Sequence, residues 1–540
     1  MDDEEEQRRP AGLQHLLRPP SNPADHEGLQ ISDDMFGGSA SSDDASTGSE
    51  MSQSDDDDED SEEMGDADED GGGSADDGGW TADITHFDPP CFSDGETVGP
   101  VRDVTPDMRP IDFFHLLVPE PVLSAIVQQT NRYAHKYQLK NGRDEEWRNV
   151  DLAEMKAFMA IFMYTSLVHG VFSEDISALW EADEITYNPV MASILTQRRF
   201  QRIMRYFHVV SSSGQQQGDS LRKIRPFLET VQNSFRNEFK TAQTHVIHEP
   251  PLEEEPLMWS RHLDRKRRKK KRFNLWVRQC TATGFISQVS CLCVPPCLQC
   301  TATGFISQIH IHVKEKSDSL SHHEKGYSVA RDLCSDLIGS GRNHIVFCIP
   351  ANTSLRLFRE LESHGVYGCG VVTDARHTDC EGLPASVLAK PPTSLRKYDS
   401  IVRTKGRYSA VLWNSPRNPF RLLTNAFSPA AQGKLVVKKN RRPDEERPCL
   451  EAVQAFQNHI KYIDKYNEKY SWYIISYKPS KTWQQLFWTV LSLAMNNAYI
   501  MYKLSPAHAH SRLSRSDFGA ELLRAMAGPY YQEPPTQGEE

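Results

Sequence analysis

The sequence lacks the features of a membrane-spanning or secreted chain. Its longest apolar stretch, Ala157–Val168, is too short to cross a bilayer. The opening residues, MDDEEEQRR, have no apolar core, so we expect no secretory signal. The 11 cysteines have no regular spacing over most of the chain, which argues for reduced thiols and an intracellular protein rather than a disulfide framework.

Basic residues are almost missing from the first part of the chain. Residues 1–100 contain 3 Lys and Arg against 30 Asp and Glu, a charge of −27, and they include the acidic run Asp55–Asp60. The rest holds 58 basic and 44 acidic residues, a charge of +14. The composition predicts a disordered acidic tail over residues 1–104 and a basic body that meets polyanions. The tail would compete for the same surface.

Apolar periodicity predicts helices in the first part of the body. Pro121 suits an early helix position, and a helix is expected from there to Tyr137. Leu152–Val168 and Leu221–Phe239 are also expected as helices, and Arg198–Val209 interleaves cations with aromatic residues. That last pattern fits either a core helix with a basic outer side or a nucleic-acid face. We therefore predict a helical domain of DNA-binding or dimerisation type over residues 105–245.

Short β-prone runs then alternate with helical patterns. The runs include Leu275–Val277, Phe305–Val313, His344–Ile349 and Tyr408–Trp413. Such alternation predicts a mixed α/β sheet domain, placed at residues 246–430. Helices are expected at 431–505, notably Leu450–Tyr470 and Thr482–Lys503, followed by a tail over residues 506–540.

Eight consecutive cations stand at the centre of the sequence. They lie between an acidic, proline-bearing segment and the β-prone run that starts at Phe273. One interpretation is a solvated face or a nuclear-import signal. The other is an edge that contacts DNA phosphates, which would add affinity without sequence selectivity. The eight are Arg265, Lys266, Arg267, Arg268, Lys269, Lys270, Lys271 and Arg272.

A ten-residue sequence occurs twice within residues 279–308. QCTATGFISQ fills Gln279–Gln288 and again Gln299–Gln308, an offset of 20 residues. The text between the copies is rich in cysteine, which suggests a zinc site. A perfect duplication without a surrounding periodic array is more typical of a retained or mis-spliced segment in the gene model.

Several blocks, in order, resemble the piggyBac-type DNA transposases. They cover roughly Pro110–Lys503 and read PIDFFHLLVP, IVQQTNRYA, DLAEMKAFMAI, RRFQRIMRYFHVV, LRKIRPFL and NNAYIMYK. Other stretches, such as HVIHEPPLEEEP and YKPSKTWQQLFW, are similar to one domesticated member nearly word for word. The resemblance implies a ribonuclease-H-like catalytic core, a DNA substrate and a nuclear location.

The resemblance also implies carboxylates that hold Mg²⁺ for strand cleavage and transfer. At the matching positions the chain has His248, Ile349 and Ser415 in place of Asp. The family's later Gly-Val-Asp-x-x-Asp-Gln block corresponds to 462–467, where Asp464 survives. An isoleucine cannot bind magnesium, and a histidine is a poor substitute in an oxygen site. The family's C-terminal zinc module is absent too, because no cysteine follows Cys449.

Other acids could build a replacement site. The candidates are Glu249, Asp175, Asp379 and Asp464, although each alone is more often a capping or surface carboxylate. Glu249 directly follows His248, and Asp379 lies in a loop rich in Gly and Pro. No metal ligand is predicted, and Mg²⁺ is expected only if catalysis persists.

Three functions stay open from the sequence. The first is a nuclear, transposase-derived protein that retains DNA transposition. The second is a catalytically inactive DNA- or chromatin-binding scaffold. The third is an interaction protein whose acidic tail recruits basic chromatin partners. Double-stranded DNA is the expected partner in the first two, a homodimer is allowed, and no membrane association is expected.

Overall fold

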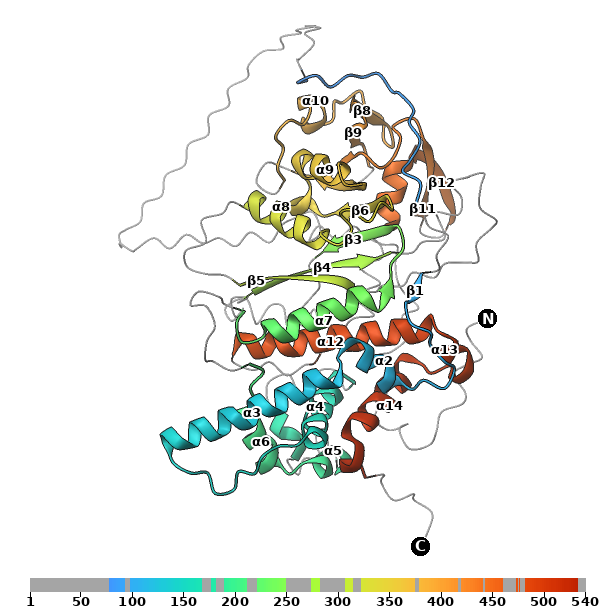
Figure 1. Ribbon diagram of the computed structural model, residues 1–540. Helices are drawn as coiled ribbons and strands as arrows, with labels where there is room; N and C mark the ends of the chain where they lie inside the picture. The colour runs from blue at the N-terminus through green and yellow to red at the C-terminus, as the bar shows by residue number, and fades with distance from the viewer. Residues whose placement is uncertain are drawn as a thin grey trace, which may run out of the picture.

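Two units stacked on each other make up the molecule (Figure 1), a mixed sheet with its helices and a helical bundle. The computed structural model describes residues 77–92, 98–167, 176–180, 189–210, 221–248, 273–281, 306–313, 322–373, 378–415, 419–439, 442–459, 473, 475 and 481–532.

The central sheet has eight strands in the order β5-β4-β3-β6-β7-β10-β9-β8. Its first three strands pair antiparallel: β3 (Thr244–His248), β4 (Phe273–Cys280) and β5 (Ile306–Val313). Next to β3, β6 (His344–Cys348) and β7 (Val366–Val372) run parallel to it. The sheet continues antiparallel through β10 (Phe420–Thr424), β9 (Tyr408–Trp413) and β8 (Ser400–Lys405). The predicted ribonuclease-H-like mixed sheet is confirmed.

Helices cover both faces of the sheet, so its central strands β3, β6 and β7 are buried on both sides. α8 (His322–Leu333) and α9 (Leu355–Glu362) pack Leu333 and Phe358 into one face. Residues 451–459 are helical and pack Val453 and Phe456 into the other. Because neither face meets water, β6 reads as the continuous run HIVFC rather than an alternating pattern.

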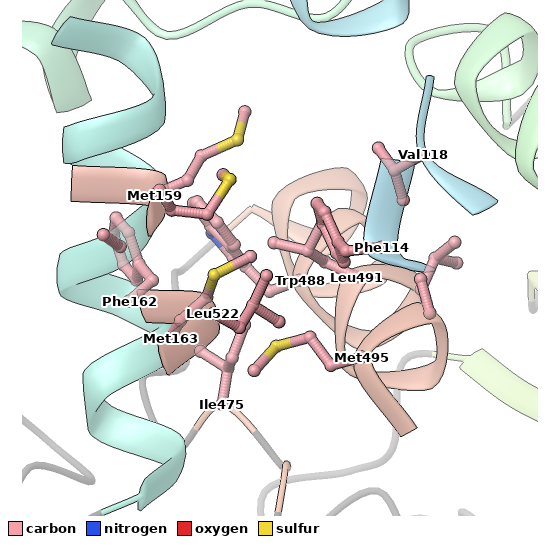
Figure 2. Close-up of a cluster of buried hydrophobic side chains, with 14 of the residues drawn as sticks. Phe114, Val118, Met159, Phe162, Met163, Ile475, Trp488, Leu491, Met495 and Leu522 are labelled. Atoms are coloured by element: carbon pink, nitrogen blue, oxygen red, sulfur yellow. The ribbon is translucent and has the colours of Figure 1, made fainter. Parts of the chain in front are cut away.

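The helical bundle is built from both ends of the chain. Figure 2 shows Met159, Phe162 and Met163 of α4 meeting Trp488, Leu491 and Met495 of α12. Phe162 and Trp488 stack with centroids 3.9 Å apart. The bundle consists of α2 (Pro110–Leu117), α3 (Glu120–Asn141), α4 (Leu152–Leu167), α5 (Pro189–Ile194), α6 (Gln197–Tyr206), α7 (Arg225–Asn237), α12 (Thr482–Lys503), α13 (Pro506–Ser511) and α14 (Arg515–Ala527). The short elements η2 (Ile176–Trp180) and η6 (Gly528–Tyr530) also belong to it.

Three expectations about the ends of the domains were wrong. Residues 506–540 were expected as a tail, yet α13 and α14 are packed, with Phe518 and Leu522 buried in the bundle. Residues 431–450 were expected as helical, yet they contain a hairpin of β11 (Gln432–Lys439) and β12 (Arg442–Leu450), since β-prone residues such as Val436 and Val437 outweigh the helical signal.

The third wrong expectation concerns the start of the folded body. Residues 77–92, assigned to the disordered tail, lie along the sheet domain as an extended segment, drawn in blue in Figure 1. Trp80 is 6% exposed and donates its indole N–H to Gly382 O at 2.8 Å. Thr81 pairs with Thr404 of the edge strand β8. A composition averaged over 100 residues hides these few anchoring side chains. β1 (Gly99–Pro100) then pairs with β2 (Phe239–Lys240).

The duplicated sequence lies in the connection between β4 and β5. The first copy ends β4 with Gln279 and Cys280, and the second begins β5 at Ile306. Gln279 pairs with Ile306, so most of the duplicated sequence falls between two paired antiparallel strands. Long insertions at such a place cost little free energy. Ala242 N donates to the buried Cys280 Sγ at 3.1 Å, and the other cysteines of the zinc hypothesis lie outside the described residues.

Within the described ranges no single helix is both long and apolar enough to cross a membrane, while the bent pair α2 and α3 meets the length and composition criteria together.

Candidate functional site at the carboxyl edge of the central sheet

The ends of β3 and β6 meet at one edge of the sheet. Ile247 and Cys348 are partners in the parallel register, so the next residues, His248 and Ile349, emerge beside each other. β7 ends at the same edge because it runs parallel to β6. In open α/β sheets, ligands bind beyond the carboxyl ends of parallel strands. These are also two of the positions at which the resemblance implies metal-binding aspartates.

His248 is integrated into the sheet rather than presented to solvent. The residue is only 2% exposed, and its Nε2 lies 3.1 Å from Oε1 of the buried Gln279 on β4. Since an amide Oε1 can only accept, the imidazole nitrogen donates this hydrogen bond. That nitrogen then carries a proton and cannot bind a metal. An imidazole in this state is suited to hold β3 against β4.

At Ile349 the local backbone is well ordered by hydrogen bonds, but the side chain has no atom that can bind a metal. It precedes the short helix η5 (Pro350–Asn352), and Thr353 Oγ1 donates to its carbonyl oxygen at 3.0 Å. Ser354 then caps α9 by accepting from Leu357 N at 3.1 Å. The strand, turn and helix are thus well formed around an alkyl side chain that offers no oxygen to Mg²⁺.

Ser415 lies far from this pair. It follows β9, which is the fourth strand from β3 in the sheet order. At about 4.8 Å between neighbouring strands, β9 lies roughly 19 Å from β3. The third implied position therefore cannot share a metal with the first two.

The structure shows one of the four alternative acids. Asp379 is partly exposed in the loop that follows β7, and its Oδ1 accepts from Glu381 N at 3.1 Å within a local turn. β7 is two strands from β3, a separation of about 10 Å. Asp175, Glu249 and Asp464 lie outside the described residues, as do Arg265–Arg272.

No cluster of three or more His, Cys, Asp or Glu side chains suited to a metal occurs in the part of the chain that the structure describes. Among the described residues, the two that end β3 and follow β6 are a histidine hydrogen-bonded to the Gln279 side chain and an isoleucine. They do not fit the hard, octahedral oxygen site that Mg²⁺ requires.

The basic run is connected to this same edge. β4 is antiparallel to β3, so it begins where β3 ends. Its first residue, Phe273, directly follows Arg272. The connection that carries the eight cations therefore leaves the sheet at His248 and returns to it at Phe273.

Sequence patterns missed a buried polar layer at the opposite end of β3. His245 and His344 lie 3.2 Å apart between Nε2 and Nδ1, and Phe92 packs against His344. Burial lowers the pKa of His344 to about 4, with a further lowering from the Arg278 charge. The guanidinium of Arg278 is fully buried and reaches Asp336 at 2.6 Å. These groups join β3, β4, β6 and the segment after α8, and no periodicity in the sequence announces them.

A sequence model of the family described as Transposase IS4 matches residues 109–499. The human PiggyBac transposable element-derived protein 5 is 41% identical over 458 residues, covering 83% of this chain and 81% of that protein. The human PiggyBac transposable element-derived protein 2 is 20% identical over 447 residues, covering 79% of this chain and 65% of that protein.

A solved structure shares the fold. A cryo-EM structure of the piggyBac transposase synaptic complex with hairpin DNA matches with a TM-score of 0.60 at 16% sequence identity. The match covers 82% of this chain and 86% of that one. At this identity the likeness concerns the fold alone.

Proposed function

Because this chain belongs to the piggyBac transposable element-derived protein family, we propose that it binds double-stranded DNA in the nucleus as a scaffold that no longer cleaves DNA strands. One observation carries the proposal. The family resemblance implies metal-binding aspartates at the carboxyl edge of β3 and β6. At these positions His248 is hydrogen-bonded to Gln279, and Ile349 has no atom that can bind a metal.

DNA as the partner is supported by charge and by the position of the basic run. Outside the first 100 residues the chain carries +14, while cations contribute most of the sequence-independent affinity for DNA. The eight-cation run returns to the sheet at Phe273, on the edge where His248 ends β3. The structural relative was solved with hairpin DNA. A duplex that reaches this edge would meet the run without needing a metal.

Retained transposition is the second candidate. It is favoured by Asp379, which follows β7 at the same sheet edge, and by Glu249, which directly follows His248 in sequence. In that case Mg²⁺ would be held by acids at new positions. The acidic tail as a binding segment for chromatin proteins and a homodimer are further proposals under either function.

A Mg²⁺ titration separates the two candidates. The wild-type protein should show no Mg²⁺-dependent rise in melting temperature and no nicking of plasmid DNA. The double variant His248→Asp/Ile349→Asp should gain a rise in melting temperature with Mg²⁺, because two carboxylates then stand on neighbouring strand ends and ligand binding stabilises the fold. Nicking by the wild-type protein that is lost on Glu249→Ala or Asp379→Ala would establish retained catalysis instead.

Neutralising the basic run tests the DNA contact. Replacing all eight residues of Arg265–Arg272 with Gln should weaken duplex binding and flatten the salt dependence, by at most about 7 in the slope of log K against log salt. Fluorescence anisotropy with a labelled duplex at several salt concentrations measures both. A control that exchanges every Arg for Lys and every Lys for Arg keeps the charge and should bind like the wild type. Equal binding by the neutralised protein would rule this segment out.

A further inference from the structure

Three cations gather where two long helices of the bundle begin. Arg222 and Lys223 lie in the turn that leads into α7, and Lys481 directly precedes α12. The two helices lie side by side, with Phe227 and Phe487 in ring contact at 4.6 Å. In Figure 1 they run in the same direction, with their amino ends together on the left.

An aromatic wall stands behind these cations. His208, just after α6, stacks on Tyr133 of α3 with centroids 4.0 Å apart. Trp483 of α12 meets the His208 ring edge-on at 5.7 Å. The backbone of His208 is held by Thr130, whose Oγ1 accepts from His208 N at 3.2 Å. Side chains from three parts of the chain thus fix one surface.

The positive charges of Arg222, Lys223 and Lys481 influence the protonation of neighbouring groups. Burial lowers the pKa of Lys223, and the charges of Arg222 and Lys481 lower it further. Burial also lowers the pKa of His208 to about 4, with added lowering from Lys223 and Lys481. No carboxylate of the described residues contributes to either shift. The fold therefore holds these positive charges close enough to repel one another.

Repulsion of this kind costs stability unless a bound anion relieves it, and locally unfavourable arrangements tend to mark functional sites. We propose that Arg222, Lys223 and Lys481 form a phosphate-binding site, with the Tyr133–His208–Trp483 stack as its rigid wall. A guanidinium and two ammonium groups supply the hydrogen-bond donors and the positive charge that a phosphate requires. The amino ends of α7 and α12 add to a positive potential that the side chains already set.

The DNA backbone is the phosphate source that the fold favours, and this part of the inference rests on the proposed function. β3 runs toward the same side of the molecule as the amino ends of α7 and α12, the left in Figure 1. The basic run rejoins the sheet at Phe273 on that edge. One duplex on this side of the molecule would meet the basic run and the three-cation site together.

The site variant is Arg222→Ala/Lys223→Ala/Lys481→Ala. Its matched control, Lys390→Ala/Arg396→Ala/Lys397→Ala, removes three exposed cations from the segment between α10 (Ala385–Leu388) and β8. Anisotropy with a labelled duplex is measured from low to physiological salt. The site variant should lose at least tenfold in affinity, and its slope of log K against log salt should fall by about 3, as expected for three phosphate contacts. The control should keep the wild-type slope. Equal losses in both variants would reduce the effect to general charge and overturn the site.

Calorimetric titration with inorganic pyrophosphate at low salt forms the second arm. Loss of both duplex and pyrophosphate binding in the site variant supports a phosphate site, and loss of duplex binding alone assigns it to the DNA backbone. Loss of pyrophosphate binding alone assigns it to a free phosphate compound. Unchanged binding of both probes overturns the site. If the wild type binds no duplex, the proposed function fails, while the pyrophosphate arm still decides this inference.

Folding of the variant is checked by its melting temperature. Removing mutually repelling charges should leave this temperature unchanged or raise it at low salt. The conservative variant Lys481→Arg keeps the charge and should bind both probes like the wild type. A failure of this variant to bind would contradict a charge-based site.

Discussion

Single side chains of this protein show how a polar group is kept neutral inside the sheet domain. His459 is the clearest example, because its ring stacks on Phe347 with centroids 4.0 Å apart and its Nδ1 lies 2.8 Å from Thr281 Oγ1. Complete burial lowers the pKa of His459 to about 3. The ring therefore packs as a flat, uncharged group against β6 at neutral pH.

This burial predicts a loss of stability in acid. Unfolded His459 binds a proton near pH 6.5 and the folded residue only near 3, so between these values the unfolded state holds more protons. The free energy of unfolding should be fully retained above pH 6.5 and fall as the pH drops toward 3, by up to about 1.4 kcal/mol per pH unit. Urea unfolding of the wild type and His459→Gln at pH 7.5, 6 and 5 measures the difference, which should shrink as the pH falls.

An exposed histidine serves as the comparison. His510→Gln, at the end of α13, should follow the wild-type pH dependence. A constant difference between the wild type and His459→Gln across this range would show that the ring does not resist protonation.

Among the elements, the segment of residues 77–92 protects the sheet. β8 is the last strand in the order and would otherwise present open backbone groups along its edge. Thr81 exchanges two backbone hydrogen bonds with Thr404, each 2.9 Å long. Asp77 accepts a hydrogen bond from Ser386 Oγ at 2.6 Å and forms an ion pair with Arg403 at 3.2 Å. This segment therefore acts as a partial ninth strand that covers the edge.

The anchor of that segment is a single indole ring. Trp80→Ala should lower the free energy of unfolding by about 3 kcal/mol, because the ring is 6% exposed and its N–H bonds Gly382 O. Ile84 lies in the same segment at 53% exposure, so Ile84→Ala should change stability by less than about 0.5 kcal/mol. Chemical denaturation compares the two. Equal effects would mean that the segment does not anchor through Trp80.

On the scale of the whole molecule, charge is divided between two parts of the chain. Residues 1–76 hold 25 Asp and Glu against 3 Lys and Arg, and the first residue that the structure describes is Asp77. The bundle exposes Arg222 and Lys481 on the side proposed for DNA. An acidic segment linked to a basic body has a high effective concentration at that surface.

Removing residues 1–76 should therefore tighten duplex binding several-fold at low salt, because an internal competitor is lost, with a smaller gain at physiological salt where screening is stronger. The deletion ends before the segment that contains Trp80, so the melting temperature should stay unchanged. A variant with the acids of Asp55–Asp60 changed to Asn and Gln keeps the length and should reproduce part of the gain. Weaker or unchanged binding would argue against competition by the tail.

The sequence by itself determined the class of fold, the family and most of the elements. Thr482–Lys503 was predicted at its observed bounds and Leu152–Val168 within one residue, since long apolar patterns dominate local preference. The absence of aspartate at positions 248 and 349 could also be inferred from the sequence, because the family's sequence blocks occur in the same order.

Only the tertiary structure decided which distant residues meet. It placed α14 in the bundle and paired Gln279 of the first copy of the duplicated sequence with Ile306 of the second. It also put three strands between those that lead to His248 and Ser415, and it brought Lys481 near Lys223. The physical reason is that local patterns report the preference of a segment for burial or extension. Contacts between segments are set by packing of the whole chain, which no short window contains.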